Sequence, residues 1–412
     1  MNKNCIFTIC AKNYLAQAFT LKESVLENNK GLDFFIFLSD LSDKEEILSD
    51  VVLLEDSWVN NWKEMAFKYD VVEFSTAIKP FAIKKLFNEG YDKVCYLDPD
   101  IYVKNSLDYI FDTLNTYSSI LTPHRCSSIR EGELIDEHAV ILNGIFNLGF
   151  FGVKNNDTGN HIIDWWSNKL TDLCYLDLWD GLAVDQKWME FIPAYYPHET
   201  LISHHLGMNA ASWNLQERTL THHEGQYILE SKIHEKKKYD LLFWHFSSYN
   251  PLTPNYLEKG NPSSNLENYP ALHQLSEEYS HRVINNGYQT YSKMHYSFKT
   301  YDNGDVILPL HRRLFRHYEK ELHGKGDMFK SDNFYYVLLK RNKLISKKSF
   351  VKLDVRRDKD IAQTNMERDK NVARKLLKCI HSLIGIDRYM LLIKAAGKIG
   401  KYDFHSFLIE DL

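Results

Sequence analysis

Two aspartates separated by one proline, Asp98-Pro99-Asp100, directly follow the apolar residues 93–97. An apolar run of this length is typical of a buried strand, and α/β proteins bind ligands at the carboxyl ends of their strands. Carboxylate oxygens are preferred ligands of divalent ions such as Mg²⁺ and Mn²⁺, and such an ion neutralises a departing diphosphate. The tripeptide therefore predicts a metal and diphosphate site. The alternative is a plain turn at the end of a strand, since Asp and Pro both favour turns.

A third candidate ligand is His245, which follows a predicted strand at residues 240–244. If both strands end at the same edge of a sheet, His245 projects toward Asp98 and Asp100. Two carboxylates and one imidazole form a mixed oxygen and nitrogen set that suits Mn²⁺ better than Mg²⁺. The alternative is a core or surface histidine, because the chain has 18 histidines.

The elements that must position these side chains alternate between strands and helices, which is typical of an α/β fold. We predict strands at residues 5–10, 34–38, 71–74, 93–97, 119–122, 146–153 and 240–244, and helices at residues 16–27, 58–69, 79–88, 157–170 and 185–191. Residues 253–270 are rich in Pro, Gly, Ser and Asn, which indicates a loop or a boundary. Helices are predicted again at residues 271–286, 311–322 and 371–399. We therefore expect an α/β domain at residues 1–260 and a mostly helical accessory domain at residues 261–412.

The composition is that of a soluble enzyme with a sizeable core. The chain has 412 residues, of which 44% are hydrophobic, and its formal net charge is -5. The start of the sequence lacks the basic and apolar pattern of a signal peptide, and no apolar run is long enough to cross a bilayer. The six cysteines form no CxxC pair, which argues against a disulfide framework and predicts a cytoplasmic location.

Charge is unevenly distributed along the chain. Residues 311–412 contain 24 Lys and Arg but 13 Asp and Glu, a net charge of +11, which leaves -16 for the rest. A basic segment can contact the anionic inner face of a membrane, the acidic body of the protein or a second copy, or it can simply be a solvated helical face. Nucleic acid is not expected as a partner, because no binding module is recognisable.

Several motifs occur in the order in which they occur in the family 8 type of GT-A glycosyltransferases, which includes bacterial lipopolysaccharide galactosyltransferases and glycogenin. The segments that resemble this family lie within residues 5–250: IFTICAKNY at 6–14, KPF at 79–81, VCYLDPDIYV at 94–103, FNLGFF at 146–151, AVDQ at 183–186 and WHFS at 244–247. The sequence departs from the family pattern at Pro123-His124-Arg125, where an acidic residue is often found near the donor sugar. It also departs after His245, where Phe246-Ser247 stands in place of Lys-Pro-Trp.

The resemblance implies a GT-A domain, that is, a Rossmann-like nucleotide-diphospho-sugar transferase fold. It implies transfer of a hexose, glucose or galactose, from a UDP-sugar to a hydroxyl of a glycan, glycoprotein or lipid-linked acceptor, with retention at the anomeric carbon. The implied roles are distributed over three groups of residues. Asp98, Asp100 and His245 would hold Mn²⁺ or Mg²⁺; Ala11, Asn13, Tyr14, Asp40 and Lys79 would contact the nucleotide and its phosphates; Asn147, Gly149, Asp185 and Gln186 would surround the sugar, with Asp185 and Gln186 beneath it.

Other activities remain open at this point. An inverting enzyme would need a carboxylate base, for which Asp185 is the candidate, although an Asp at the start of a helix is also a routine cap. Nucleotidyl transfer would need a Gly- and Arg-rich loop after the first strand, and residues 11–15 contain no glycine. A non-catalytic binder of nucleotide-sugars or glycans stays an alternative. Residues 204–209 and 213–215, which mix His, Asn and Trp, have the composition of a sugar-binding region.

Overall fold

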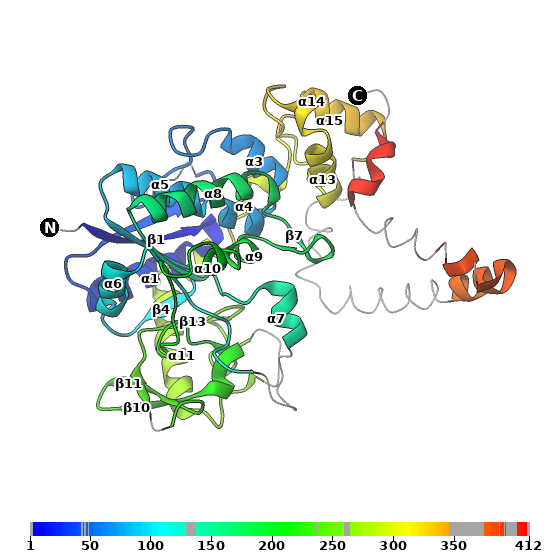
Figure 1. Cartoon of the computed structure of the whole chain (residues 1–412). Helices are drawn as coiled ribbons and strands as arrows, with labels where there is room; N and C mark the ends of the chain where they lie inside the picture. Colours follow the sequence, from blue (N-terminus) through cyan, green and yellow to red (C-terminus); the bar gives the residue numbers. More distant parts are fainter. Residues whose placement is uncertain are drawn as a thin grey trace. The chain divides into compact units, whose positions relative to one another are not determined.

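The computed structural model describes residues 3–42, 44, 47, 49–128, 137–235, 237–258, 264–345, 375–386, 388–390, 392 and 402–409. Its contacts separate two compact units (Figure 1). Unit 1 comprises residues Met1–Trp62 and Val71–Tyr296, and unit 2 comprises Lys63–Asp70 and Ser297–Leu412. Unit 1 is of the α/β class and the secondary structure described in unit 2 is helical, which confirms the predicted fold class.

A six-stranded sheet of order β2-β1-β3-β6-β5-β9 forms the centre of unit 1. Its strands are β1 (Asn4–Cys10), β2 (Asp33–Leu38), β3 (Lys93–Leu97), β5 (Ser119–Leu121), β6 (Phe150–Lys154) and β9 (Thr200–Ile202). β1 runs parallel to β2 and β3, and β5 runs parallel to β9. β6 is antiparallel to both of its neighbours, β3 and β5. The sheet is therefore mixed around a parallel N-terminal half.

Helices cover both faces of this sheet (Figure 1). On one side lie α1 (Leu15–Asn28) and α6 (Asp108–Thr116), and on the other α5 (Lys79–Asn88) and α8 (Asp157–Leu173). Alternate residues of a strand point to opposite faces. In β3, Cys95 and Leu97 belong to the core under α1 and α6, whereas the Tyr96 ring contacts Phe7, and the next strand sends Phe151 to Trp166 of α8. The apolar run of β3 is thus buried on both sides.

The turn that carries the two aspartates connects β3 to a second, two-stranded sheet. After Asp98-Pro99-Asp100 the chain continues as β4 (Ile101–Val103), which pairs with β13 (Phe243–His245) in antiparallel register. His245 faces Ile101 in this register, and the backbone N–H of Phe246 donates to the Asp100 carbonyl oxygen at 2.9 Å. This pairing brings His245 next to the turn at residues 98–100.

Several predicted boundaries differ from the structure. Residues 71–74, predicted as a strand, lie in helix α4 (Val71–Ala77), where Ser75 and Thr76 donate side-chain hydrogen bonds to the carbonyls of Val71 and Val72. The strand predicted at 146–153 begins only at Phe150. The strand predicted at 240–244 is divided between β12 (Lys238–Asp240) and β13, because residues 241 and 242 pass from one sheet to the other.

A three-stranded sheet, which the sequence patterns did not predict, lies in the segment after residue 200. It contains β10 (Arg218–His223), β11 (Gln226–Ser231) and β12. β10 and β11 form a hairpin whose two turn residues, Glu224 and Gly225, both have positive φ angles, 49° and 84°. Such a pair is typical of a two-residue hairpin turn with glycine second.

Unit 1 extends beyond the predicted division after residue 260. Helix α11 (Pro270–Asn285) places Leu272, Leu275 and Tyr279 in one core with Trp244 and Phe246. The Tyr279 ring stacks on Phe246 at a centroid distance of 4.2 Å. α11 is therefore part of unit 1, which continues to Tyr296.

Unit 2 combines most of helix α3 (Trp62–Lys68), from Lys63 onward, with helices from beyond residue 297. These are α13 (Pro309–His317), α14 (Glu319–Leu322) and α15 (Phe334–Arg341). The buried Arg312 guanidinium donates to the carbonyls of Ala66, Phe67 and Tyr69, and Phe67 packs against Phe315 and Tyr335. Residues 63–70 are therefore part of the core of unit 2. Among the described residues, no helix has the length and apolarity required to span a membrane.

Candidate active site

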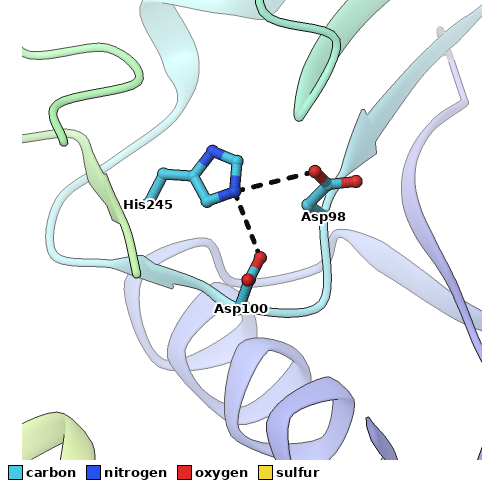
Figure 2. Close-up of side chains that lie close together, drawn as sticks. All are labelled: Asp98, Asp100 and His245. Atoms are coloured by element: carbon cyan, nitrogen blue, oxygen red, sulfur yellow. Dashed lines mark ion pairs between the residues drawn. The ribbon is translucent and has the colours of Figure 1, made fainter. Parts of the chain in front are cut away.

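Asp98, Asp100 and His245, the three predicted metal ligands, lie together in unit 1 (Figure 2). His245 Nε2 lies 3.2 Å from Asp100 Oδ1 and 3.6 Å from Asp98 Oδ2. Neighbouring ligands of an octahedral ion, each about 2.1 Å from it, would be about 3 Å apart. Within the described ranges this is the one group of three or more His, Cys, Asp or Glu side chains close enough to share an ion. Its spacing and its mixture of oxygen and nitrogen atoms fit a divalent cation.

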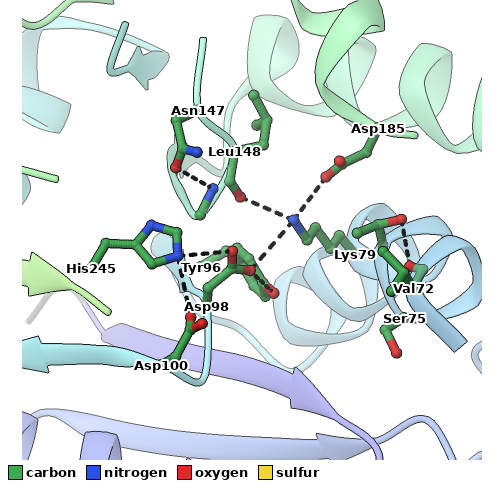
Figure 3. A network of polar contacts seen from close by, with 12 residues as sticks. Val72, Ser75, Lys79, Tyr96, Asp98, Asp100, Asn147, Leu148, Asp185 and His245 are labelled. Carbon is green, nitrogen blue, oxygen red and sulfur yellow. Dashed lines mark hydrogen bonds and ion pairs between the residues drawn. The ribbon is translucent and has the colours of Figure 1, made fainter. Parts of the chain in front are cut away.

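Neighbouring side chains set the orientation of the first carboxylate. The Tyr96 hydroxyl donates to Asp98 Oδ1 at 2.6 Å, which leaves Asp98 Oδ2 toward His245 (Figure 3). Burial followed by the charge of Asp98 raises the pKa of Tyr96 well above its usual value, so the phenol remains a donor. The Asp98 backbone N–H donates to the Gly149 carbonyl at 2.8 Å, which fixes the start of the turn against residue 149.

Gly149 is required by the close approach of His245. A Cβ atom at this position would lie 2.4 Å from His245 Cε1 and 2.8 Å from Asn147 Oδ1. Neither distance is compatible with a real side-chain contact. The glycine predicted as a point of close backbone approach to a ligand therefore makes room for the histidine.

The charge of His245 reflects two opposing effects. Burial by itself lowers the pKa of the imidazole, but Asp100 and then Asp98 raise it by a larger amount, so the net shift is upward. An imidazole whose pKa is raised by two carboxylates sits in a negative field. That same field attracts a cation.

Lys79, predicted to contact the phosphates, and Asp185, predicted to lie beneath the sugar, form a buried ion pair (Figure 3). Lys79 Nζ lies 2.8 Å from Asp185 Oδ2 and 3.8 Å from Asp98 Oδ1, and it donates to the Leu148 carbonyl at 2.9 Å. It also lies 4.2 Å from the centroid of the Tyr96 ring. One cation thus links the start of α5, the metal-ligand turn and the residue before α9 (Gln186–Met189).

Asp185 immediately precedes α9 and follows a residue with a strained backbone. Burial raises the pKa of its carboxyl, and Lys79 opposes that shift. The preceding residue, Val184, has a φ angle of 46°, which is rare for a β-branched residue. Strain of this kind persists where the surroundings impose it, and it is concentrated at functional sites. Gln186, the second predicted catalytic residue, donates from its amide to the Asn143 carbonyl at 2.5 Å.

Asn147 lies beside the metal-ligand group, and its side-chain amide is engaged by protein groups. Its Oδ1 accepts from the Gly149 backbone N–H at 3.1 Å and from Asn209 Nδ2 at 2.9 Å. Its Nδ2 lies 3.2 Å from His124 Nε2. Asn209 Oδ1 in turn lies 3.2 Å from His245 Nδ1. A polar network therefore extends from His124, where the sequence departs from the family pattern, to His245.

The predicted nucleotide-binding residues occupy the loop after β1 and the end of β2. Ala11 is buried, Asn13 is partly buried and Tyr14 is 40% exposed. Burial, followed by the charge of Asp100, raises the pKa of Tyr14 to about 12. Asp40 is buried and accepts from the backbone N–H groups of Leu41 and Lys12 at 2.8 and 3.4 Å. In this arrangement Asp40 orders the loop after β1.

Two further side chains complete the site and were not among the predicted site residues. Asn209 is 2% exposed, and the ring of Trp213 stands edge-on to His245 at a centroid distance of 5.2 Å. The composition of residues 204–209 and 213–215 indicated a functional region but not these contacts. The adjacent His205 packs between Tyr109 and Tyr239, which is a structural role.

The chain is similar in sequence to an uncharacterised bacterial protein, and it aligns with solved glycosyltransferase structures at low identity. No family model matches the chain. The uncharacterized protein YfnF of Bacillus subtilis (strain 168) is 25% identical over 289 residues, which cover 67% of this chain and 91% of YfnF.

Solved structures that align with the chain include the galactosyltransferase LgtC in complex with donor and acceptor sugar analogues, at 16% identity and a TM-score of 0.38. That alignment covers 68% of this chain and 95% of LgtC. The apo form of the glycosyltransferase GlyE of Streptococcus pneumoniae TIGR4 aligns at 16% identity and a TM-score of 0.39, over 73% of this chain and 67% of GlyE.

Proposed function

We propose that unit 1 is a GT-A catalytic domain that transfers a hexose, glucose or galactose, from a UDP-sugar to a hydroxyl of a glycan, glycoprotein or lipid-linked acceptor. The observation that carries the proposal is the convergence of Asp98, Asp100 and His245 at the carboxyl end of β3. Sugar-nucleotide chemistry needs a group that neutralises a diphosphate at the edge of an α/β sheet. Two carboxylates and an imidazole at that edge can hold Mn²⁺, or Mg²⁺, for this purpose.

The residues around the cation have separate roles in this proposal. When bound, the ion supplies positive charge to the diphosphate as UDP leaves. Tyr96 holds Asp98 with one oxygen toward the ion, and Gly149 gives His245 the space to reach it. Tyr14, which is partly exposed in the loop after β1, stacks on the uracil base, and Asn13 contacts the nucleotide.

Asp185 acts through Lys79 in the structure as it stands, because its carboxylate is buried in an ion pair. We assign the pair a positioning role: Asp185 fixes Lys79 near Asp98, where the ammonium adds to the positive charge at the diphosphate. Gln186 and Asn147 lie on the sugar side. No strong base is exposed at Asp185, which favours retention of anomeric configuration over an inverting reaction.

A donor screen tests the activity. Purified protein is incubated with Mn²⁺ and a panel of UDP-sugars, and release of UDP is measured with and without EDTA. We expect metal-dependent release from one hexose donor, and NMR of the transferred sugar is expected to show an α-product from an α-donor. A β-product would overturn retention. UDP-sugar binding without any release, across the panel and with acceptors supplied, would favour a non-catalytic binder.

We also propose that a helix in the basic C-terminal region contacts an anionic membrane surface. Residues 375–386 are helical, and Leu376 and Leu383 on this helix are 61% and 83% exposed. Lys375 precedes Leu376, and Lys378 lies between the two leucines in the sequence. Exposed leucines beside lysines are typical of a helix that lies in the interface of anionic lipid.

Flotation with vesicles containing phosphatidylglycerol tests this contact. The full chain is required, because removing residues 311–412 would also remove most of the core around Phe67. We expect wild-type protein to float and Leu376→Glu/Leu383→Glu to stay at the bottom. Equal flotation of both proteins would overturn the membrane contact. Loss of a dimer in the variant, measured by light scattering, would assign the helix to self-association.

A further inference from the structure

The hydrogen bonds on the Nδ1 side of His245 have only one consistent arrangement, and it starts at a group of fixed polarity. The Gly149 backbone N–H can only donate, and its partner is one end of the Asn147 amide, at 3.1 Å. That end must therefore be the oxygen. Because Asn147 Oδ1 is an acceptor, the end of the Asn209 amide that lies 2.9 Å from it must be the nitrogen.

The orientation of Asn209 then decides the state of His245. With Nδ2 toward Asn147, Asn209 presents Oδ1 to His245 Nδ1 at 3.2 Å. An amide oxygen can only accept, so His245 Nδ1 must carry a hydrogen. A flipped Asn209 would place its oxygen against Asn147 Oδ1 and near the Asn147 carbonyl, two repulsive contacts. The flipped arrangement is excluded on this ground.

The other end of the network agrees with this assignment. Asn147 Nδ2 faces His124 Nε2 at 3.2 Å, so that nitrogen must accept. His124 Nδ1 must then donate, and it faces the Ile145 carbonyl, an obligatory acceptor, at 3.3 Å. This neutral form is also the one that burial favours, since burial lowers the pKa of His124 to about 4. The network thus begins at an obligatory backbone donor, the Gly149 N–H, and ends at an obligatory backbone acceptor, the Ile145 carbonyl.

We propose that Asn209 is a positioning residue that holds a hydrogen on His245 Nδ1, so that Nε2 is the nitrogen that can offer a lone pair to a metal ion. Nε2 is the nitrogen that faces Asp100 and Asp98. Without Asn209, the Nε2–H tautomer could donate to Asp100 Oδ1 and would block the ligand atom. The inference rests on the metal-binding function proposed above, and it follows the general rule that the other ring nitrogen of a metal-binding histidine is held by a hydrogen bond.

The backbone of Asn209 provides a suitable test variant. Its φ angle is 48°, a conformation that asparagine and glycine tolerate. Asn209→Gly therefore removes the amide without adding backbone strain. Thr122→Val is the matched control, because Thr122 Oγ1 accepts the remaining hydrogen bond of Asn209 Nδ2 at 3.0 Å and lies outside the path to His245.

Two measurements decide the role of Asn209. The tautomer of His245 is read from ¹⁵N chemical shifts of the metal-free protein, at a pH where the imidazole is neutral, and Mn²⁺ affinity is read by electron paramagnetic resonance. We expect Asn209→Gly to convert His245 to the Nε2–H form and to weaken Mn²⁺ binding about 10- to 100-fold. Thr122→Val is expected to lower the melting temperature and to leave both readings as in the wild type.

The proposal is overturned if Asn209→Gly keeps the Nδ1–H tautomer, or if its Mn²⁺ affinity matches that of Thr122→Val. Failure of the proposed metal-binding function would give a different result. In that case the wild type itself does not bind Mn²⁺, whereas the tautomer measurement still shows whether Asn209 controls His245.

Discussion

Lys79 Nζ lies 2.8 Å from Asp185 Oδ2, and both side chains are 2% exposed. A lysine in the first turn of a helix is normally solvated and is disfavoured by the helix dipole. Here it is buried at the N-terminus of α5, with Asp185, Asp98 and the Leu148 carbonyl around it. The pair therefore connects the metal-ligand turn to the segment that begins with Asp185, and it can be tested separately from the metal.

Replacing Lys79 by methionine is expected to destabilise unit 1 by about 3 kcal/mol or more, because it leaves a buried carboxylate without its partner. Lys84→Met is the matched control on the same helix, since Lys84 pairs with Asp164 at 52% exposure of both side chains. A pair this exposed contributes about 1 kcal/mol or less. Chemical denaturation followed by tryptophan fluorescence measures both variants. Adding Asp185→Asn should restore part of the stability lost in Lys79→Met, and equal losses for Lys79→Met and Lys84→Met would contradict the importance of the buried pair.

Replacing Gly149 by alanine is expected to displace His245 and to weaken Mn²⁺ binding at least about tenfold, while the fold is retained. The reason is steric, since the added Cβ would lie 2.4 Å from His245 Cε1. Gly152→Ala, further along β6, is the control, because the nearest atom to its added Cβ is 3.4 Å away. Electron paramagnetic resonance titration gives the affinities, and circular dichroism checks the fold. Unchanged Mn²⁺ affinity in Gly149→Ala would show that His245 is not a ligand.

The stability of unit 2 is expected to fall as the pH is lowered from about 6.5 to about 4. His311 is fully buried, and burial lowers the pKa of its imidazole to about 4. In the unfolded chain this imidazole binds a proton near pH 6.5, whereas in the folded protein it does so only near pH 4. The stability that neutral His311 contributes is therefore complete above about pH 6.5 and is lost as the pH falls below it, by up to about 3 kcal/mol. Denaturant unfolding curves recorded at several pH values measure how steeply the free energy of unfolding changes with pH. His311→Gln should flatten it in this window, and an unchanged slope would assign the dependence to other groups.

The central strands could be predicted from sequence because their signals are local. The apolar run of β3 and the Asp-Pro-Asp turn after it lie where they were expected, and the turn carries both carboxylates to the predicted site. Helix α4 could not be predicted in the same way. Its two valines favour a strand, but buried Glu73 accepts from the Leu176 backbone N–H at 3.0 Å, a contact across 103 residues.

The network behind His245 was invisible in the sequence for a similar reason. Asn209 and His245 are 36 residues apart, and their contact depends on how β13 pairs with β4. The resemblance to known motifs identified His245 but not the residue that orients it. In contrast, the β10–β11 hairpin carried a readable signal, a Glu-Gly turn between two segments with β-branched and aromatic residues.

The most direct test of the proposed metal-assisted donor site is the affinity for UDP, measured calorimetrically with Mn²⁺ and with EDTA. Wild-type protein and Asp100→Asn are compared, with Asp164→Asn as a surface control. We predict that UDP binds the wild type and the control only when Mn²⁺ is present, and that Asp100→Asn weakens this binding by about 100-fold, roughly 2.7 kcal/mol. Equal UDP affinity with EDTA, or in Asp100→Asn, would contradict a metal-held diphosphate at Asp98, Asp100 and His245.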